Sequence, residues 1–416
     1  MFSSLESRVL DAIHEEEIVR LTQELIRIPT VGRDEQAIAE HVAGRMRGWG
    51  FPEVLVQGIE GHPGRANLVA TIPGRSRRPR LLTTAHMDTA PVDLADRATW
   101  VCDPFAGEIR DGHVFGRGAH DDKAGCAIVT LAAKAILDAG VTLPGDLVVA
   151  LVADEEGLML GMRQLIRSGL HRTIDACIGA DPFDGQALFE SFGGRTYGVV
   201  TVKGRTAHAS MPPWSHEGVN AVTKAAKLIN ALDRHQPSYL EHPLWGRPYW
   251  QVLRVESGWG GTLTAQLPDR CRLLVDARLV PDQDPETVWV ELRAVLAKLQ
   301  SDDPDFAWEL EVPDHRPGYH TKLDDPVVMA VSAAYHQLTG LHLKVREPDE
   351  SGPLTIGTTD THYLAYEGIP CVNLPGPVAE TQPVNAHLAN ENVTIATLVA
   401  STRCLALAIL RYFNVR

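Results

Sequence analysis

The chain has 416 residues, of which 44% are hydrophobic, and a formal net charge of -14. This length exceeds one ordinary hydrophobic core, so we expect two domains. The acidic balance argues against binding to a phosphate backbone, and it does not identify a substrate. The N-terminus lacks a basic-then-apolar leader pattern, and we expect no apolar run long enough to span a bilayer. We therefore expect a cytoplasmic protein with no nucleic-acid or membrane partner.

The six cysteines are scattered along the chain and form no C-x-x-C pair. Most of them fall in apolar runs, which favours buried free thiols over disulfides or a cysteine zinc site. If the protein binds a metal ion, we expect histidine and carboxylate ligands.

Helical and strand-like patterns alternate over the first part of the chain. Helical apolar periods cover residues 8–28, 34–47 and 124–139, and apolar strand-like runs cover residues 67–72, 80–85, 146–152 and 174–179. The run 146–152 is continuously apolar, which is typical of a strand covered on both faces of a parallel sheet. The pattern predicts an α/β fold with a mostly parallel sheet flanked by helices.

A different pattern begins near residue 194. Strands are predicted at 196–203, 250–256, 271–279 and 306–312, with helices at 217–232 and 285–299. The order β-α-β-β-α-β is that of a ferredoxin-like α+β unit, so we expect an inserted domain over residues 194–315. Residues 1–193 and 316–416 then form the catalytic domain, which ends with an amphipathic helix over 392–413.

Polar side chains follow three of the predicted strands directly. His86 follows the run 80–85, Asp154, Glu155 and Glu156 follow 146–152, and Asp181 follows 174–179. In open α/β sheets, ligands bind at the carboxyl ends of the strands. These side chains are therefore candidates for a common site.

A glycine-rich stretch at residues 116–125 reads GRGAHDDKAG and immediately precedes an apolar helical pattern. Glycine permits the tight turn that would present Asp121. Asp is also a favoured helix N-cap, and for this stretch alone capping is the better interpretation. The other candidate residues along the chain change that balance.

Five positions form a possible ligand set of two imidazoles and three carboxylates: His86, Asp121, Glu156, Asp181 and His387. Such donors suit zinc, manganese or cobalt. One carboxylate shared between two ions, with one histidine and one carboxylate for each, would make a two-metal hydrolytic site. Ions in such sites lie about 3.5–4 Å apart and activate a water molecule between them.

Two neighbours of these residues have predicted roles. Glu155, next to a ligand, would be the general base. Asp88 lies two residues after His86, so on a strand it could hold the imidazole in its metal-binding tautomer. Taken singly, the acidic triplet at 154–156 is more simply a solvated turn, and a lone histidine at a strand end is more simply a satisfied polar residue. The five together are much harder to explain in that way.

The motifs resemble those of the zinc amidohydrolase family that includes acetylornithine deacetylase, succinyl-diaminopimelate desuccinylase, aminoacylase and glutamate-releasing carboxypeptidases. Residues 86–91 (HMDTAP) resemble its H-x-D-x-x-P motif, residues 116–123 its G-R-G-x-x-D-x-K segment, and residues 154–157 its D-E-E-G. The resemblance covers essentially the whole chain. It implies that Asp121 bridges two metal ions, most simply zinc.

The resemblance also implies a role for each remaining ligand. His86 and Asp181 would serve one ion, Glu156 and His387 the other, and Glu155 would be the base. The inserted domain resembles the family's lid and dimerisation domain. Its segment 203–210 is similar to the family's G-x-x-A-H, which implies that His208 reaches the active site of a partner subunit in a homodimer.

Substrate-binding candidates also follow from the resemblance. Arg278 in the lid's D-x-R could grip a substrate carboxylate through two hydrogen bonds. A structural pairing with Asp276 is nearly as plausible, and His208 alone would be an exposed loop histidine. Gly357 and Thr358 resemble the family's glycine-threonine loop near the substrate.

The chain departs from the family pattern in three places. Asp122 stands where many members have Met, and Ala124 stands where Gly is frequent; we expect neither to affect the metals. Residues 264–267 (TAQL) lack the Asn that several deacylases have before the proline. This puts acetylornithine and succinyl-diaminopimelate in doubt as substrates.

We therefore predict a two-metal hydrolase that cleaves the amide of an N-acyl amino acid, a small peptide or a related small amide. One alternative is hydrolysis of a non-peptide aryl or heterocyclic amide by the same machinery. Another is a catalytically silent binding protein of the same fold, against which the intact Glu155 and ligand set argue.

Overall fold

The computed structural model describes residues 2–31, 34–92, 94–181, 187–188, 190–212, 215, 217–239, 241–258, 265–281, 283–345, 357–378 and 382–415. The chain forms two compact units. The first contains Met1–Glu190, Thr321–Arg346 and Thr359–Arg416, and the second contains Ser191–His320 and Glu347–Thr358. The predicted inserted domain, residues 194–315, lies within the second unit. Each unit has a hydrophobic core of its own.

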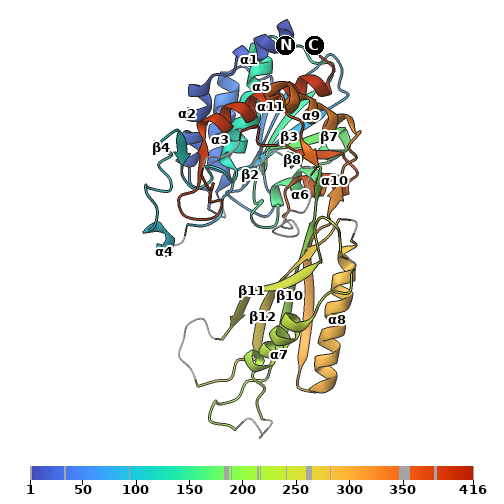
Figure 1. Ribbon diagram of the computed structural model, residues 1–416. Helices are drawn as coiled ribbons and strands as arrows, with labels where there is room; N and C mark the ends of the chain where they lie inside the picture. The colour runs from blue at the N-terminus through green and yellow to red at the C-terminus, as the bar shows by residue number, and fades with distance from the viewer. Residues whose placement is uncertain are drawn as a thin grey trace. The chain divides into compact units, whose positions relative to one another are not determined.

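A six-stranded sheet is the centre of the first unit (Figure 1). Its strands, in spatial order, are β1 (Glu53–Gly58), β2 (Ala66–Ile72), β6 (Leu147–Val152), β3 (Leu81–His86), β7 (Ala176–Gly179) and β16 (Cys371–Asn373). The last four pair in parallel, and β1 and β2 form an antiparallel edge. Every residue of β6 is buried, because both faces of the parallel part are covered. The predicted α/β class is confirmed.

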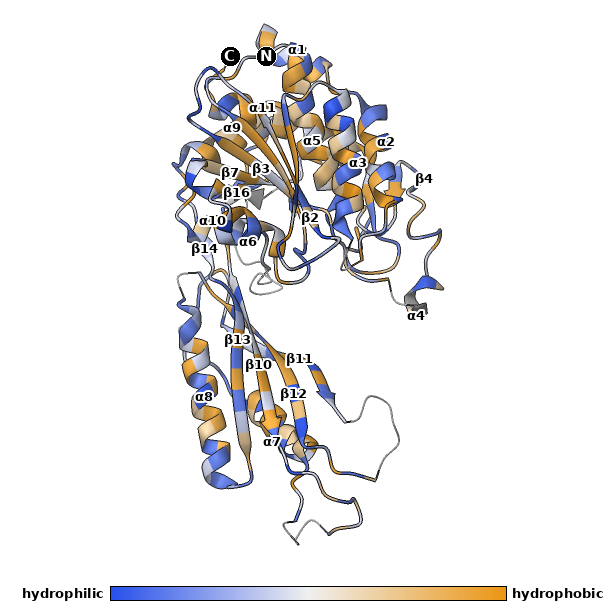
Figure 2. Ribbon diagram, turned by 180° about the vertical axis from the view of Figure 1, so that it is seen from behind, coloured by the Kyte–Doolittle hydropathy of each residue, from blue (hydrophilic) through white to orange (hydrophobic). Residues whose placement is uncertain are grey.

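Helices flank this sheet, and Figure 2 shows its strands as mainly hydrophobic. The helices of the first unit are α1 (Ser4–Asp11), α2 (Glu15–Ile26), α3 (Glu35–Gly48), α4 (Leu94–Arg97), α5 (Lys123–Asp138), α6 (Leu160–Arg167), α9 (Pro326–Thr339), α10 (Thr361–Tyr366) and α11 (Ile395–Tyr412), with a 3-10 turn over Leu170–Thr173. Helix α5 packs on β3 and β6, α3 packs on β1 and β2, and α9 and α10 pack on β7 and β16. Short strands complete this unit: β4 (Glu108–Arg110), β5 (His113–Phe115) and β17 (Asn392–Thr394) form one sheet, and β8 (Ala187–Leu188) pairs with β15 (Lys344–Val345).

The second unit is a four-stranded antiparallel sheet with two helices. In spatial order the strands are β11 (Tyr249–Ser257), β12 (Arg270–Leu279), β10 (Gly194–Lys203) and β13 (Ala307–Arg316), and the helices are α7 (Ala221–Arg234) and α8 (Pro285–Asp302). A short pair, β9 (Ser191–Phe192) and β14 (Tyr319–His320), belongs to the same unit. This arrangement agrees with the predicted β-α-β-β-α-β order. The ring of Trp289 in α8 packs on Gly198, where an added Cβ would lie 2.6 Å from the ring.

Three predicted helices differ from the observed ones. The single period over 8–28 is two helices, because His14 adopts an extended conformation between α1 and α2 while both helices bury apolar residues in the same core. Helix α7 begins at Ala221 rather than 217, because the side chain of Asn220 caps it by accepting from Val222 N and Thr223 N. The final helix begins at Ile395, because residues 392–394 pair with β5 as β17.

Helix α11 corrects the expectation that no apolar run in the chain is long enough to span a bilayer. Its 18 residues are long and apolar enough to cross a membrane by length and composition. However, 61% of this segment is buried inside the protein, where α11 packs against α9 and α5. Its apolar character is therefore that of a core helix.

Candidate metal centre

The carboxyl ends of three parallel strands lie at one edge of the central sheet, and each carries a candidate ligand. His86 is the last residue of β3, Asp181 follows β7 by two residues, and Glu156 follows β6 by four. Asp121 comes from the segment just before α5, and His387 comes from the segment before β17. The sheet and these two segments together bring all five predicted ligands to one place.

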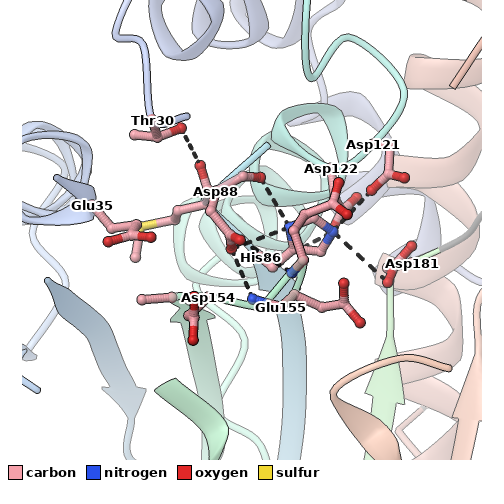
Figure 3. Close-up of polar contacts among 12 residues, drawn as sticks. Thr30, Glu35, His86, Asp88, Asp121, Asp122, Asp154, Glu155 and Asp181 are labelled. Atoms are coloured by element: carbon pink, nitrogen blue, oxygen red, sulfur yellow. Dashed lines mark hydrogen bonds and ion pairs between the residues drawn. The ribbon is translucent and has the colours of Figure 1, made fainter. Parts of the chain in front are cut away.

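The first group contains His86, Asp121 and Asp181, whose ligand atoms lie within 4.8 Å of one another (Figure 3). His86 Nε2 is 2.9 Å from Asp121 Oδ1 and 3.9 Å from Asp181 Oδ2. The His86 side chain is only 1% exposed. A buried imidazole with two carboxylates at this spacing is a suitable divalent-metal site.

The second group contains Asp121, Glu156 and His387, again within 4.8 Å. His387 Nε2 is 2.9 Å from Asp121 Oδ2 and 2.8 Å from Glu156 Oε1. His387 has φ of 63°, in the left-handed region. For a residue other than glycine this conformation costs about 1–2 kcal/mol, so contacts outside the residue must hold it.

Asp121 is common to both groups, and its two oxygens face different imidazoles. This is the arrangement expected of a shared carboxylate. Its neighbour Asp122 stands at the N-cap position of α5 but makes no side-chain capping hydrogen bond. Asp122 Oδ2 instead accepts a hydrogen bond from His86 N at 3.0 Å. The capping alternative therefore does not account for these two acids.

The orientation of His86 differs in detail from the prediction. His86 Nδ1 is 3.0 Å from the main-chain oxygen of Asp88, and 3.5 Å from its Oδ1 atom. The Asp88 carboxylate also accepts hydrogen bonds from Glu155 N at 3.0 Å and Glu156 N at 3.1 Å. The carbonyl of Asp88 therefore makes the shorter contact with the imidazole, and its carboxylate, besides facing the imidazole, holds the turn that carries the predicted base and ligand.

Buried ion pairs stabilise the acidic turn at residues 154–156. Asp154 has φ of 67°, and its carboxylate pairs with Arg65, whose guanidinium also lies 2.9 Å from Glu35 Oε1. The other Asp154 oxygen accepts from Leu158 N at 3.0 Å. Burial, followed by the charge of Asp88, raises the pKa of Glu35 to about 7. Asp154 is thus a structural residue of the turn, and the solvated-turn alternative does not describe it.

Charges within the cluster shift its pKa values strongly. Burial disfavours the charged form of His86, but its hydrogen bonds to Asp121 and Asp88 outweigh this and raise its pKa well above the usual range. Hydrogen bonds to Asp121 and Glu156 raise the pKa of His387 to about 10. Burial and the charge of Asp121 raise the pKa of Asp181, and the charge of Glu155 adds to this effect. Glu155, which is itself buried, therefore lies within electrostatic reach of the cluster.

The donor set fits two divalent cations. Three carboxylates and two imidazoles converge at one edge of the sheet, and carboxylates this close repel one another unless protons or cations compensate them. The donors are oxygen and nitrogen atoms with no thiolate, which suits zinc, cobalt or manganese. Within the described residues no other group of this kind occurs.

The remaining predicted residues lie elsewhere. His208 and Arg278 belong to the second unit, where His208 is exposed and Arg278 Nε donates to Asp276 Oδ2 at 2.8 Å. The pairing of Arg278 with Asp276 is the structural alternative considered above. Gly357 and Thr358 are half-buried in irregular backbone before α10. Roles of these four residues in catalysis or substrate binding stay predictions, and Thr264 lies outside the described residues.

The residues that support the ligands were not predicted from the sequence. These are Glu35, Arg65, Arg117 and Glu391, all of which form buried ion pairs behind the ligand-bearing segments. Arg117 lies inside the motif that carries Asp121, and Glu391 lies four residues after His387, which is a usable signal. Glu35 and Arg65 have no such signal, because Arg65, which pairs with Glu35, joins them to the acidic turn through Asp154, which is remote in sequence.

An α/β sheet edge with this donor set is suited to metal-assisted hydrolysis. The sequence model of Peptidase family M20/M25/M40 matches residues 82–411, and the chain belongs to this family of metallohydrolases that act on amide bonds.

Curated relatives match nearly the whole chain. A protein of Bacillus subtilis named N-formyl-4-amino-5-aminomethyl-2-methylpyrimidine deformylase is 29% identical, over 96% of this chain and 95% of its own. A succinyl-diaminopimelate desuccinylase of Methylobacterium radiotolerans is also 29% identical, over 95% of this chain and 96% of its own.

Solved structures share the fold at lower identity. The di-peptidase Dug1p of Saccharomyces cerevisiae has a TM-score of 0.78 at 18% identity and covers 99% of both chains. The YXEP protein of Bacillus subtilis, described as a dinuclear metal-binding peptidase, has a TM-score of 0.64 at 16% identity and covers 95% of this chain and 98% of its own.

We predict that metal binding to the metal-free protein releases protons. His387 has a pKa of about 10 and the pKa of His86 is also raised, so both imidazoles are protonated at neutral pH and must lose a proton to bind a metal. The apparent affinity should rise with pH by about tenfold per unit for each proton displaced. Calorimetry of zinc binding in buffers of different ionisation enthalpy measures this release.

The variant His387→Ala should release fewer protons than the natural chain. Binding heats that are the same in every buffer, together with an affinity that does not change with pH, would contradict the prediction.

Proposed function

We propose that this protein uses two divalent metal ions, most simply zinc, to hydrolyse the amide bond of an N-acyl amino acid, small peptide or related small amide. Cobalt or manganese would also suit the donors. The observation that carries the proposal is the Asp121 carboxylate, whose two oxygens each face a separate histidine–carboxylate group. A single ion would not need a shared carboxylate between two such groups. We retain the cytoplasm as the predicted location.

Bound metals would polarise the scissile carbonyl and lower the pKa of the attacking water. Glu155 would accept a proton from that water while the water oxygen bonds to the carbonyl carbon. It would then donate the proton to the nitrogen as the carbon–nitrogen bond breaks, giving a carboxylic acid and an amine. Its buried position and its main-chain hydrogen bond to Asp88 Oδ1 support this role, because they fix the backbone from which the Glu155 side chain extends.

The hydrogen bonds of His208 support its proposed role as an oxyanion donor. Ser210 N donates to His208 Nδ1 at 3.2 Å, and Ser210 Oγ lies 2.7 Å from the same atom. A main-chain N–H can only donate, so Nδ1 is an acceptor and the proton of the neutral ring lies on Nε2. Nε2–H is then able to donate to the oxygen of a tetrahedral intermediate.

The edge of the second unit's sheet supports the proposed homodimer. Strand β11 lies at this edge, and it exposes Leu253 and Val255, which are 49% and 48% exposed. An edge strand with exposed apolar side chains is a surface that another strand can cover. A second copy of the chain would cover it and would bring its own His208.

Hydrolysis of a heterocyclic amide is the second candidate function. A relative that is 29% identical over nearly the full chain is named as a deformylase of a pyrimidine amide. The segment before Pro268 also lacks the Asn of several deacylases of the family. The missing Asn favours a substrate outside the acetylornithine and succinyl-diaminopimelate classes, and the named deformylase makes a heterocyclic amide a specific alternative.

A substrate panel tests the proposed function. Zinc and cobalt forms of the protein should hydrolyse at least one compound among N-acyl amino acids, dipeptides and N-formyl or N-acyl aminomethylpyrimidines, measured by release of the amine. A chelator should abolish the activity, and added metal should restore it. Activity in a protein shown to be metal-free would refute the two-metal mechanism. A metal-loaded protein that hydrolyses none of the compounds would favour the silent binding protein.

Glu155 and Glu156 should differ in what their loss removes. Glu155→Gln should lower kcat by about 10²–10⁴-fold while both metals remain bound, because only proton transfer is lost. Glu156→Gln, the matched neighbour, should lower the metal content instead. Metal analysis beside steady-state kinetics separates the two. If Glu155→Gln loses metal and Glu156→Gln keeps it, the two roles are exchanged.

Mixed dimers test whether His208 acts in the partner's site. Glu155→Ala and His208→Ala homodimers should both be nearly inactive. A mixed dimer has one site with an intact Glu155 that receives an intact His208 from the other chain. Co-expressed variants with different tags, purified on both tags, should therefore regain about half of the activity of the natural dimer. A doubly tagged dimer as inactive as its parents would place His208 in its own chain's site or outside catalysis.

A further inference from the structure

Arg117 and Glu391 form an ion pair that is completely buried beside the metal centre. Arg117 Nη1 is 2.6 Å from Glu391 Oε2, and the two side chains are 1% and 0% exposed. A buried ion pair is more stable when its remaining donors and acceptors also find partners. Besides each other, Arg117 and Glu391 bond to main-chain atoms of the segments that carry Asp121 and His387, and to the main-chain oxygen of Pro91.

Glu391 holds the segment of the shared carboxylate. Its Oε1 atom accepts hydrogen bonds from His120 N at 3.0 Å and Asp121 N at 2.9 Å. Its main-chain oxygen accepts from Gly116 N at 3.0 Å, at the start of the same glycine-rich segment. One residue near the end of the chain thus fixes the backbone of Asp121, which is 270 positions away.

Arg117 holds the segment of the exposed ligand. Its Nη2 atom donates to the main-chain oxygen of His387 at 3.1 Å and to that of Pro91 at 3.2 Å. The guanidinium also lies over the ring of Trp100, with its central carbon 5.5 Å from the ring centroid. His387 is in the left-handed conformation and its side chain is 51% exposed, so the packing of its side chain cannot hold it in place.

We infer that Arg117 and Glu391 are positioning residues, which set the separation between Asp121 and His387 and so determine the affinity of the second metal site. This inference rests on the proposed two-metal function. Glu391 fixes Asp121, Arg117 fixes His387, and the ion pair joins them into one rigid connection.

Besides the shared Asp121, the Arg117–Glu391 pair holds a ligand of the second group only, which is His387. Within the described residues, the pair makes no hydrogen bond or ion pair with His86 or Asp181, which lie at or just beyond the ends of β3 and β7. His86 is held separately by Asp122 and by the Asp88 carbonyl. Loss of the connection should therefore weaken the site of His387 and Glu156 more than the site of His86 and Asp181.

Metal titration of a conservative variant tests the inference. Arg117→Lys keeps the charge, but its single ammonium cannot reproduce the planar fork that reaches Glu391, Pro91 and His387 together. When metal-free protein is titrated with cobalt, the natural chain should bind two equivalents. Arg117→Lys should bind one equivalent normally and the other about 10–100-fold more weakly. The absorption spectrum of its one-cobalt form should match that of His387→Ala and not that of His86→Ala.

A matched control comes from the second unit. Arg316 Nε pairs with Asp314 Oδ2 at 2.7 Å, and the two side chains are 0% and 1% exposed. Arg316→Lys changes a buried pair of the same kind away from the ligands, so it should bind both equivalents with natural affinity. Thermal unfolding of each variant shows whether it is folded.

A second variant covers the case in which Arg117→Lys does not fold. The double variant Arg117→Met/Glu391→Gln removes both charges, which buried pairs often tolerate. It lacks the hydrogen bond to His387 and should show the same selective loss. The inference is overturned if folded variants bind both equivalents as the natural chain does, or if they lose both equally. A natural protein that binds fewer than two equivalents overturns the proposed function as well.

Discussion

The two oxygens of the Asp121 carboxylate face two different imidazoles, and the organisation of the first unit depends on this contact. Around it, further carboxylates lie close enough to raise the pKa values of their neighbours. Such a concentration of negative charge in a poorly solvated place is stable only with protons or cations among the carboxylates. The carboxylates raise the pKa values of the two imidazoles, which favours positively charged rings there, and divalent metals would supply the positive charge in the proposed enzyme.

The fold meets this constraint with parallel strands. Because β3, β6 and β7 run in the same direction, their carboxyl ends deliver a histidine, a glutamate and an aspartate to one edge. Two further ligands come from segments that the sheet does not hold. For these the chain uses buried side chains that bond to main-chain atoms, as Glu391 does with Asp121 and Arg117 does with His387.

Relatives of the same family are named for amide hydrolysis on different substrates. Relatives of equal identity are named for removing a formyl group from a pyrimidine derivative and a succinyl group from diaminopimelate. The proposed chemistry is consistent with both names, because metals and a base at such a site would act on the amide and not on its substituents. Substrate choice therefore depends on residues outside the cluster, and the candidates Arg278 and Thr358 are among those whose roles stay predictions.

The sequence by itself determined the parts of the protein that local patterns encode. Alternating apolar runs predicted the α/β sheet and the β-α-β-β-α-β unit, and acids directly after strands predicted which residues gather at the sheet edge. Tertiary structure alone decided what supports them. In the folded chain the Asp88 carboxylate accepts a hydrogen bond from Glu155 N, and Arg65 pairs with Asp154. Arg117 pairs with Glu391, which is 274 positions away. The physical reason is that a buried charged side chain pairs with a group that the fold brings within hydrogen-bond distance. The separation of two residues along the chain does not determine their distance in space.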